Sequence, residues 1–320
     1  MSPVFWQRRY PSANVILLPG ARPVLVDTGF GAGVPALLDW LIGQGVNLAM
    51  LRVVNTHAHT DHVGGNHALA LQGIPSAMAA VDAAPILARD VNACAADFLA
   101  QPIEPFTVAH ILHPGEVIDT GVARWTVVPT PGHTAGHVSL TDGTTIVLGD
   151  ALHGTDLGWI DLHTYPEGLD WTADTLARLA RLPARIGYSG HGPAITDLPA
   201  ALARGESRLA RFRADPAHAV WHGARRNFAH HLVMTGGVDA DGMMDHFGLM
   251  PWLGAMAALL SLSPAAFLDA LVTSCVRGDA AHWQAGRLLA TVAHDVPPPG
   301  WAQAPTSPAD WSDVPSPAWR

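Results

Sequence analysis

The stretch LRVVNTHAHTDHVGG, residues 51–65, contains the most informative motif of the chain. Its first six residues form an apolar run with the composition of a buried strand, which leads directly into a histidine cluster. The cluster consists of His57, His59, Asp61 and His62, which are all side chains of the kind that bind metal ions. Because His57 and His59 alternate, we expect both to face one metal ion, while Asp61 and His62 turn toward a second. The stretch therefore predicts a metal site in the loop after a buried strand.

Three downstream segments each place one more potential ligand beside a glycine, directly after a β-type run. They are Pro131-Gly132-His133-Thr134, Leu148-Gly149-Asp150 and Ser189-Gly190-His191-Gly192. A single histidine in a sequence is usually structural or merely exposed, but a pattern repeated after several strands is difficult to obtain by chance. We therefore expect His133, Asp150 and His191 to join the ligands of residues 57–62.

The charged residues restrict the classes of function. The chain of 320 residues has a net charge of −9, and all 18 of its basic residues are arginine, so it contains no lysine. A chain without lysine has no Walker-A phosphate clamp, Schiff-base lysine or Ser–Lys dyad. The acidic balance argues against nucleic acid or an anionic membrane as a partner, because such binders need a basic stripe. The 18 histidines instead favour metal or acid–base chemistry.

The cysteine content and the apolar pattern indicate the compartment. Two cysteines, Cys94 and Cys275, fit a reducing environment without a disulfide framework. The N-terminal residues show no signal-peptide pattern. The longest apolar stretch, Leu249–Leu262, contains Pro251 and is shorter than the roughly 20 residues that span a bilayer. We expect a cytoplasmic protein that does not enter a membrane.

The pattern of apolar residues divides the chain into three parts. Residues 1–197 alternate short β-type runs with helical segments, in two strand-rich halves that favour an α/β sandwich over a single parallel sheet. Residues 198–296 predict a helical domain without a competing strand signal, with helices over Leu198–Ala214, Ala217–Met234, Gly254–Leu260, Pro264–Val276 and Ala280–Ala293. Residues 297–320 are rich in proline and tryptophan and lack a period, which predicts a disordered or extended tail.

On these motifs, residues 14–197 resemble the metallo-β-lactamase-fold hydrolase superfamily. The segments PGHTAGH (131–137) and SGHGP (189–193) are most similar to its glyoxalase-II-like branch. The resemblance implies an α/β fold, an αββα sandwich with the site along one edge of two sheets, here with a C-terminal α-helical domain or cap. It also implies that one metal ion is bound by His57, His59 and His133. A second ion is expected to be bound by Asp61, His62 and His191, and Asp150 is expected to bridge the two.

Two further residues match supporting positions of that family. Asp27, in the turn Asp27-Thr28-Gly29, is expected to orient a ligating histidine through a hydrogen bond, and the alternative is a plain turn residue. His137, the last residue of the PGHTAGH motif, is expected to hold the loop rather than to bind metal.

The ligand set indicates the chemistry. Imidazole and carboxylate ligands without a thiolate suit two Zn²⁺ ions best, with Fe or Mn as alternatives. A hydroxide that bridges two such ions exists at neutral pH and can attack a carbonyl or phosphoryl centre. Asp61 is expected to hydrogen-bond this nucleophile and to carry its proton to the leaving group. We therefore predict a metal-dependent hydrolase that cleaves an ester-type bond of a small molecule, namely a thioester, a lactone or a carboxyl ester.

Differences from individual subfamilies narrow the range of substrate classes that we expect. True β-lactamases of this fold generally lack the bridging aspartate and many use a cysteine ligand, so we expect β-lactam hydrolysis at most as a side activity. Acyl-homoserine lactonases typically have a tyrosine three residues after that aspartate, where this chain has His153. His153 either polarises the substrate carbonyl in place of that tyrosine or is a solvent-facing loop residue. The sequence assigns no role to Tyr188.

Two other activities share the motif. Nucleases and phosphodiesterases of this fold also use a dinuclear site, and Arg204, Arg208 and Arg211 lie on one face of a predicted helix. Glu206 and the net charge oppose phosphate binding on that face. Persulfide dioxygenases bind a single Fe at a similar motif. Substrate and metal content would identify either activity.

The predicted C-terminal helices allow two interpretations. Their aromatic and histidine side chains either form a helical core or line an acyl or aromatic pocket that faces the metal ions: Trp221, His222, His230, His231, His246 and Phe247. The sequence also leaves open whether this part of the chain mediates a homo-oligomer.

Overall fold

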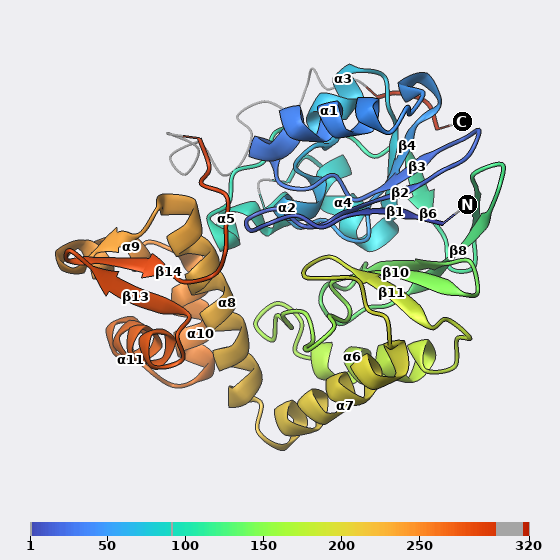
Figure 1. Cartoon of the computed structure of the whole chain (residues 1–320). Helices are drawn as coiled ribbons and strands as arrows, with labels where there is room; N and C mark the ends of the chain where they lie inside the picture. The colour runs from blue at the N-terminus through green and yellow to red at the C-terminus, as the bar shows by residue number, and fades with distance from the viewer. Residues whose placement is uncertain (1, 91, 299–315, 320) are drawn as a thin grey trace.

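Two β-sheets lie face to face in the structure, a computed structural model that describes residues 2–90, 92–298 and 316–319 (Figure 1). The first sheet has the strand order β1-β2-β3-β4-β5-β6. Strands β1 to β3 pair antiparallel, whereas β3 to β6 pair parallel and are therefore joined by crossover connections. In chain order these strands are Val4–Trp6, Val15–Leu18, Val24–Val26, Arg52–Val54, Ser76–Ala79 and His110–Leu112.

The second sheet has the order β11-β10-β9-β8-β7. All its neighbours pair antiparallel except β10 and β11, which are parallel and separated in sequence by a helix. Strands β9 and β10 are buried along their whole length, as the centre of a sandwich requires. In chain order the strands β7 to β11 are Val117–Asp119, Arg124–Pro129, Val138–Thr141, Thr145–Gly149 and Ile186–Ser189.

Helices cover the outer side of each sheet, and apolar cores separate the layers. Helix α1 packs on the first sheet through Leu37 and Leu41, and α6 and α7 pack on the second sheet through residues such as Leu176 and Leu202. A third core, which contains Trp125, fills the space between the sheets. This order of layers confirms the αββα sandwich (Figure 1). The helices of the first part are α1 Val34–Gly43, α2 Thr60–Val63, α3 Asn66–Leu71, α4 Ala80–Leu87, α5 Ala96–Leu99 and α6 Gly168–Leu179, with 3-10 turns η1 Gly31–Gly33, η2 Leu48–Met50 and η3 Ala93–Ala95.

The chain beyond residue 197 is mainly helical, as the sequence predicts. Helix α7 packs against α6 and so belongs to the outer layer of the sandwich. The helices that follow share a separate core with a small sheet of order β12-β14-β13 (Figure 1). The elements are α7 Leu198–Ala214, α8 Ala217–Thr235, β12 Val238–Asp239, η4 Ala240–Gly242, α9 Met243–Phe247, α10 Pro251–Leu259, α11 Pro264–Arg277, β13 Ala281–Gln284 and β14 Arg287–Ala290.

One predicted helix, Ala280–Ala293, is wrong. The structure forms the antiparallel hairpin β13–β14 there. Ala285 and Gly286 make the two-residue turn with φ values of 48° and 82°, which is the left-handed backbone that tight hairpins require. Leu288 of this hairpin is buried in the C-terminal core. Turn chemistry and tertiary packing therefore override the local helical pattern.

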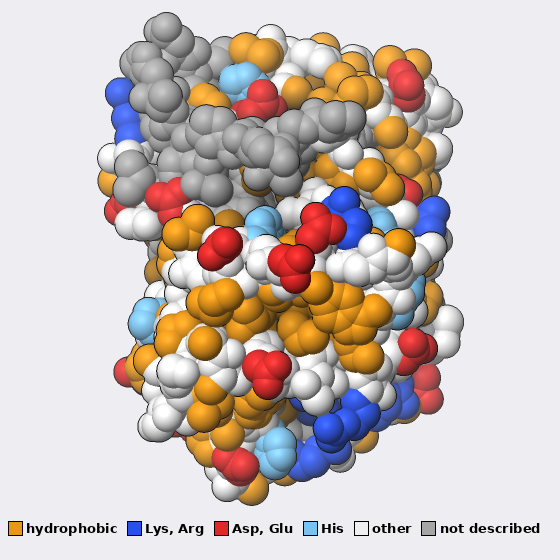
Figure 2. Space-filling view, turned by 90° about the vertical axis from the view of Figure 1, so that its left-hand side faces the viewer, with side chains coloured by type: hydrophobic (Ala, Val, Ile, Leu, Met, Phe, Trp, Pro, Cys, Tyr) orange, Lys and Arg blue, Asp and Glu red, His pale blue; other side chains and the backbone are white. Residues whose placement is uncertain are grey.

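The outer side of the C-terminal part faces the viewer in Figure 2, where apolar side chains spread across the middle of the face. This part of the chain exposes Leu249, Leu259 and Trp283, among others. In the described residues, no single helix is long and apolar enough to cross a membrane. The bent pair α10 and α11 passes that test together, by length and composition alone.

Most of the predicted tail, residues 299–315 and 320, lies outside the described residues. Within the described segment 316–319, the ring of Trp319 stacks on His110 of β6 at a centroid separation of 5.1 Å. The guanidinium carbon of Arg52 lies 5.1 Å from the same ring. This segment therefore packs against the sandwich.

Candidate metal centre

The predicted metal ligands lie together at one edge of the sandwich. Residues 57–62 follow β4, His133 follows β8, Asp150 follows β10 and His191 follows β11. Residues far apart in the chain converge here because each ligand comes directly after a strand and the strand ends meet at the same edge. A glycine is needed at position 190, since a Cβ there would lie 2.1 Å from Oδ1 of Asp150.

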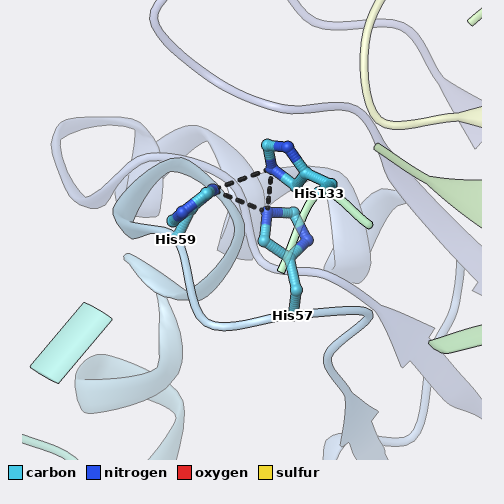
Figure 3. Close-up of side chains that lie close together, drawn as sticks. All are labelled: His57, His59 and His133. Atoms are coloured by element: carbon cyan, nitrogen blue, oxygen red, sulfur yellow. Dashed lines mark hydrogen bonds between the residues drawn. The ribbon is translucent and has the colours of Figure 1, made fainter. Parts of the chain in front are cut away.

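Three imidazole nitrogens face one another in the first cluster (Figure 3). Nε2 of His57, Nδ1 of His59 and Nε2 of His133 lie 2.8–3.1 Å apart. His133 donates its Nδ1 proton to the carbonyl of Trp159, and His57 donates its own to Thr56 Oγ1, 3.0 Å away. A neutral imidazole carries one such proton, so the unshared electron pairs of His57 and His133 point at each other. This arrangement suits a cation held between them.

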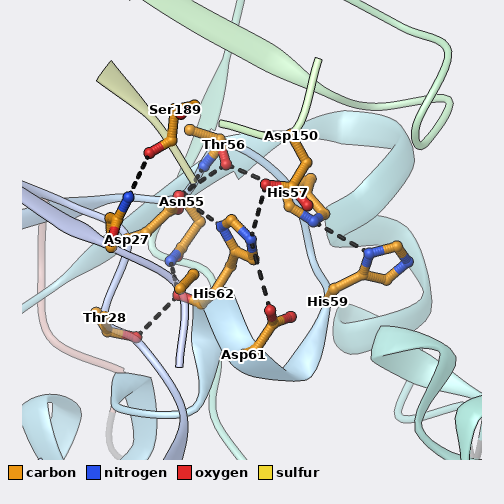
Figure 4. Close-up of polar contacts among 12 residues, drawn as sticks. Asp27, Thr28, Asn55, Thr56, His57, His59, Asp61, His62, Asp150 and Ser189 are labelled. Atoms are coloured by element: carbon orange, nitrogen blue, oxygen red, sulfur yellow. Dashed lines mark hydrogen bonds and ion pairs between the residues drawn. The ribbon is translucent and has the colours of Figure 1, made fainter. Parts of the chain in front are cut away.

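The second cluster surrounds Asp150 (Figure 4). Its Oδ1 lies 3.4 Å from Nε2 of His62, and its Oδ2 lies 3.5 Å from Nε2 of His191 and 3.7 Å from Nε2 of His133. Asp61 Oδ2 lies 3.1 Å from the same nitrogen of His191. His62 Nε2 and Asp150 Oδ1 are buried without a hydrogen-bond partner among the described residues. Asp150 therefore lies between the clusters, where one carboxylate can contact an ion in each.

A buried carboxylate orients His62, as predicted for Asp27. Asp27 accepts a hydrogen bond of 2.7 Å from His62 Nδ1 and two of 2.8 Å from the backbone N and the Oγ1 of Thr56 (Figure 4). Burial opposes protonation of His62, but Asp27, Asp61 and Asp150 together raise its pKa well above the usual value. The surrounding carboxylates thus favour a positive charge at this position, and a divalent ion would supply one.

Five of the predicted ligands have the protonation states that metal binding needs. Burial lowers the pKa of His57 well below its usual value, that of His59 to about 3 and that of His133 to about 4. Burial opposes ionisation of Asp61 and Asp150, yet the neighbouring imidazoles hold both pKa values below their usual range. Neutral imidazoles and ionised carboxylates are the forms that bind divalent ions. The first cluster offers imidazole nitrogen, the second adds carboxylate oxygen, and neither contains sulfur, which suits Zn²⁺, Fe or Mn.

Residues 8–191, which include both clusters, match the sequence model of the Metallo-beta-lactamase superfamily. The chain belongs to this superfamily. Solved structures agree on the fold. A metallo-beta-lactamase family protein from Thermus thermophilus aligns over 90% of this chain and 98% of its own, with a TM-score of 0.54 at 23% identity. A metallo-beta-lactamase from Cronobacter sakazakii aligns over 68% of this chain and 99% of its own, with a TM-score of 0.54 at 20% identity.

Curated relatives in the superfamily are similar over part of their length. The lactamase-like protein nscB of Aspergillus fumigatus is 30% identical over 189 residues, which are 57% of this chain and 48% of the relative. Thioesterase pkgB of Emericella nidulans is 28% identical over 58% of this chain and 47% of the relative. Acyl-coenzyme A thioesterase MBLAC2 of Bos taurus is 29% identical over 49% of this chain and 66% of the relative. The chain thus spans about half the length of the first two.

His137 belongs to neither ligand cluster but supports the loop that carries Asp150. Its Nε2 accepts a hydrogen bond of 3.0 Å from the backbone N of Asp150, and its Nδ1 lies 2.8 Å from Thr130 Oγ1. The side chain therefore fixes the loop that carries Asp150. This contact confirms the structural role predicted for His137.

Asp82, at the start of α4, is a supporting residue that the sequence analysis missed. Its carboxylate accepts hydrogen bonds from the backbone N of Ala58 (3.0 Å) and Gly136 (2.9 Å) and from Thr134 Oγ1 (2.9 Å). It therefore ties the loop of residues 57–62 to the loop that carries His133. Burial raises its pKa to about 6. An aspartate in the first turn of a helix is common, so no pattern marked it.

A cavity of about 260 Å³ opens over the two clusters. Five of the ligands line it, and helix α8 contributes Arg225, Arg226, Asn227 and His230 to its wall. Tyr10 also lines it and stacks on His191, with ring centroids 5.0 Å apart and planes inclined by 2°. Among these side chains of α8 and Tyr10, the sequence indicated His230 alone as a candidate for the pocket. No motif or spacing marks the others, because their place depends on how α8 and the N-terminal segment pack.

His153 lies beside Asp150 and is buried rather than solvent-facing. Its Nε2 is 3.3 Å from Oδ1 of Asp150, and burial lowers its pKa. The residues that line the cavity do not include it. Tyr188 lies in the core between the sheets, where its ring is 5.2 Å from that of Phe5.

The C-terminal residues considered in the sequence are divided between core and cavity. His230 lines the cavity, whereas Trp221 and Phe247 pack in the C-terminal core. His222 Nε2 lies 2.9 Å from a carboxylate oxygen of Asp156. The Nε2 atoms of His231 and His246 lie 2.9 Å from each other. These contacts support the core interpretation for most of the set.

The predicted arginine face on α7 is largely engaged by the loop after β10. Arg208 Nε lies 2.9 Å from Asp156, and Arg204 donates to the carbonyl of Gly154 at 3.0 Å. Arg211 is exposed. The three side chains therefore do not form a continuous phosphate-binding row.

Proposed function

We propose that this protein is a metal-dependent hydrolase of ester-type bonds, with thioesters as the first class to test. The observation that carries the proposal is the convergence of two buried ligand clusters, with unshared electron pairs, on one open cavity. The names of two relatives, a thioesterase from Emericella nidulans and an acyl-coenzyme A thioesterase from Bos taurus, support the choice of thioesters.

The donor atoms fit two divalent ions. One would bind between the three histidines of the first cluster, the other between Asp61, His62 and His191, with Asp150 shared by both. When bound, such ions lower the pKa of a shared water and polarise a substrate carbonyl. The nitrogen and oxygen donors favour Zn²⁺, with Fe or Mn as alternatives.

Asp61 is the residue that we expect to move the proton. Its carboxylate lines the cavity, and the neighbouring imidazoles keep it ionised in spite of burial. It takes a proton from the attacking water and returns it to the leaving group, so that water adds across the ester bond to give an acid and a thiol or alcohol. His153 acts through Asp150, which its Nε2 contacts at 3.3 Å, and it is a positioning residue in this proposal.

A substrate panel tests the proposal directly. Zn-loaded and Fe-loaded protein is assayed against an ester, a thioester, a lactone, a phosphodiester and a β-lactam, and bound metal is measured by mass spectrometry. We expect about two metal ions per chain and the highest kcat/KM among the ester-type substrates. Asp61→Ala is expected to lower kcat by roughly 100-fold or more, the range of general acid–base catalysis.

Other outcomes would replace the proposal. Preferential cleavage of the phosphodiester would indicate a phosphodiesterase, and one Fe per chain with oxidation of a persulfide would indicate a dioxygenase. Less than one transition-metal ion per chain would contradict the metal centre itself. Activity that is unchanged in Asp61→Ala would reject the proton-transfer role.

A further inference from the structure

Two cavities flank the first cluster, and His59 and His133 line both. The one described above, of about 260 Å³, is bounded by α8 and is called the α8 cavity. The other, of about 290 Å³, is lined by α4 and by residues such as Phe98 and Tyr165, and is called the α4 cavity. A molecule cleaved at the cluster therefore has room for one part on each side.

The two cavities differ in charge. Arg225 and Arg226 line the α8 cavity, and the acidic residues that line it are the metal ligands Asp61 and Asp150. The α4 cavity has the opposite character, because Asp82 and Asp161 line it and no arginine does so among the described residues. An anionic group is therefore favoured in the α8 cavity and disfavoured in the α4 cavity.

Nearby carboxylates do not neutralise the arginines of α8. Arg226 Nη2 lies 3.4 Å from Asp156, but that carboxylate also pairs with Arg208 at 2.9 Å and with a histidine. Arg225 donates to the hydroxyl of Ser274 at 3.0 Å, and within the described part of the chain no carboxylate is in ion-pair range of it. A guanidinium has five N–H donors, so most of those of Arg225 remain available to a ligand.

Two buried polar atoms beside the arginines also lack partners. Nδ2 of Asn227 and Nε2 of His230 make no hydrogen bond to any described residue, and both side chains line the α8 cavity. Because an unpaired buried polar atom costs free energy, a ligand group or an ordered water that paired with these atoms would be stabilised. Helix α8 comes this near because residue 223 is glycine: a Cβ on Gly223 would lie 2.3 Å from Cδ1 of Trp159.

We propose that the α8 cavity binds an anionic group of the substrate, a carboxylate or a phosphate, through Arg225 and Arg226, with Asn227 donating to a neighbouring carbonyl. The uncharged part of the same molecule lies in the α4 cavity, against Phe98 and Tyr165. The inference rests on the proposed function in so far as it calls the ligand a substrate. It specifies a class: thioesters or esters that carry a negative charge on one side of the cleaved bond.

Matched thioesters identify the side that carries the charge. Butyryl N-acetylcysteamine is neutral, succinyl N-acetylcysteamine has a carboxylate on the acyl side, and butyryl phosphopantetheine has a phosphate on the thiol side. With the Zn-loaded protein, we expect one of the two anionic thioesters to show a kcat/KM about 10–100-fold above that of the neutral one. The identity of the preferred thioester assigns the charge to the acyl or the thiol side.

Variants of the arginines test whether α8 causes the preference. Arg225→Gln is expected to remove most of it and Arg225→Lys to keep part of it, because lysine retains the charge. Arg211→Gln removes the same charge from an exposed position on α7 and is expected to keep the preference. Circular dichroism confirms that each variant is folded, and Arg226→Gln replaces Arg225→Gln in the comparison if the latter does not fold.

Calorimetry with the corresponding thioethers, which cannot be hydrolysed, separates this inference from the proposed function. We expect the anionic thioether to bind the Zn-loaded protein about 10–100-fold more tightly than the neutral one, and Arg225→Gln to remove most of the difference. If no thioester is hydrolysed but this Arg225-dependent binding persists, the proposed function is wrong and the anion site stands. If neutral and anionic compounds bind and react alike, the anion site is wrong even where thioesters are hydrolysed.

Discussion

Oδ2 of Asp27 lies 2.7 Å from Nδ1 of His62, and the two side chains are only 1% and 0% exposed to solvent. Asp27 has a positive φ of 60°, an uncommon backbone conformation for a residue other than glycine. The contact orients the ring of His62 and leaves Nε2 directed at Asp150. A buried carboxylate therefore holds His62 in place within the second cluster.

We expect Asp27→Ala to weaken metal binding at the second cluster by roughly 10–100-fold, because His62 loses the partner that orients its ring. Competition with a chromophoric chelator for Zn²⁺ measures the affinity. The control is Asp39→Ala, which changes an exposed aspartate on α1. Equal affinities of Asp27→Ala and the parent protein would show that the contact does not support metal binding.

Asp82 joins two ligand loops, so its removal is expected to affect stability as well as metal binding. Asp82→Ala leaves two buried backbone N–H groups and one hydroxyl without an acceptor, which should lower the free energy of unfolding by about 2–5 kcal/mol. Urea denaturation measures the change, with the exposed Asp174→Ala on α6 as control. A loss no larger than that of the control would mean that other contacts hold the loops.

The convergence of the predicted ligands could be foreseen from the sequence because each occurs in a short motif after a strand. The strand supplies an apolar pattern, and the glycine beside each ligand marks the turn. His57 and His133 lie far apart in the chain, yet the fold that their motifs imply determines that they meet. Local patterns and family resemblance together therefore predict where these side chains meet.

The wall of the cavity could not be predicted in this way. Arg225 and Asn227 look like ordinary polar residues of a helix, and their position depends on the close approach of α8 to Trp159 at Gly223. The hairpin β13–β14 was missed for a related reason, since its register depends on packing against the C-terminal core. Contacts between distant elements leave no periodic signal in a single sequence.

The approach of α8 to the sandwich is itself testable at Gly223. A Cβ there would lie 2.3 Å from Cδ1 and 2.4 Å from Nε1 of Trp159, so Gly223→Ala forces the helix or the indole to move. We expect a loss of about 1–3 kcal/mol in the free energy of unfolding and a weaker preference for anionic substrates. Gly254→Ala on α10 is the matched control, because nothing lies within 4 Å of its Cβ position. Helix propensity alone should make that control equally or more stable, by up to about 1 kcal/mol.

His231 and His246 face each other through Nε2 atoms 2.9 Å apart in the C-terminal part. Burial, followed by the nearby imidazoles of His246 and His230, lowers the pKa of His231 to about 3. The usual value of 6.5 applies to the unfolded chain, so between these two values the unfolded state binds the extra proton and the folded state does not.

The contribution of His231 to stability is therefore complete above about pH 6.5 and is lost as the pH falls toward about 3. His231→Gln removes this proton uptake and should make the decline of stability between pH 6.5 and 4 shallower, by up to about 1 kcal/mol per pH unit. Urea midpoints at pH 7.5, 6, 5 and 4 measure the slopes, and the exposed His113→Gln serves as control. If His231→Gln and the control decline in parallel with the parent protein, the buried histidine pair does not set the acid sensitivity of the C-terminal part.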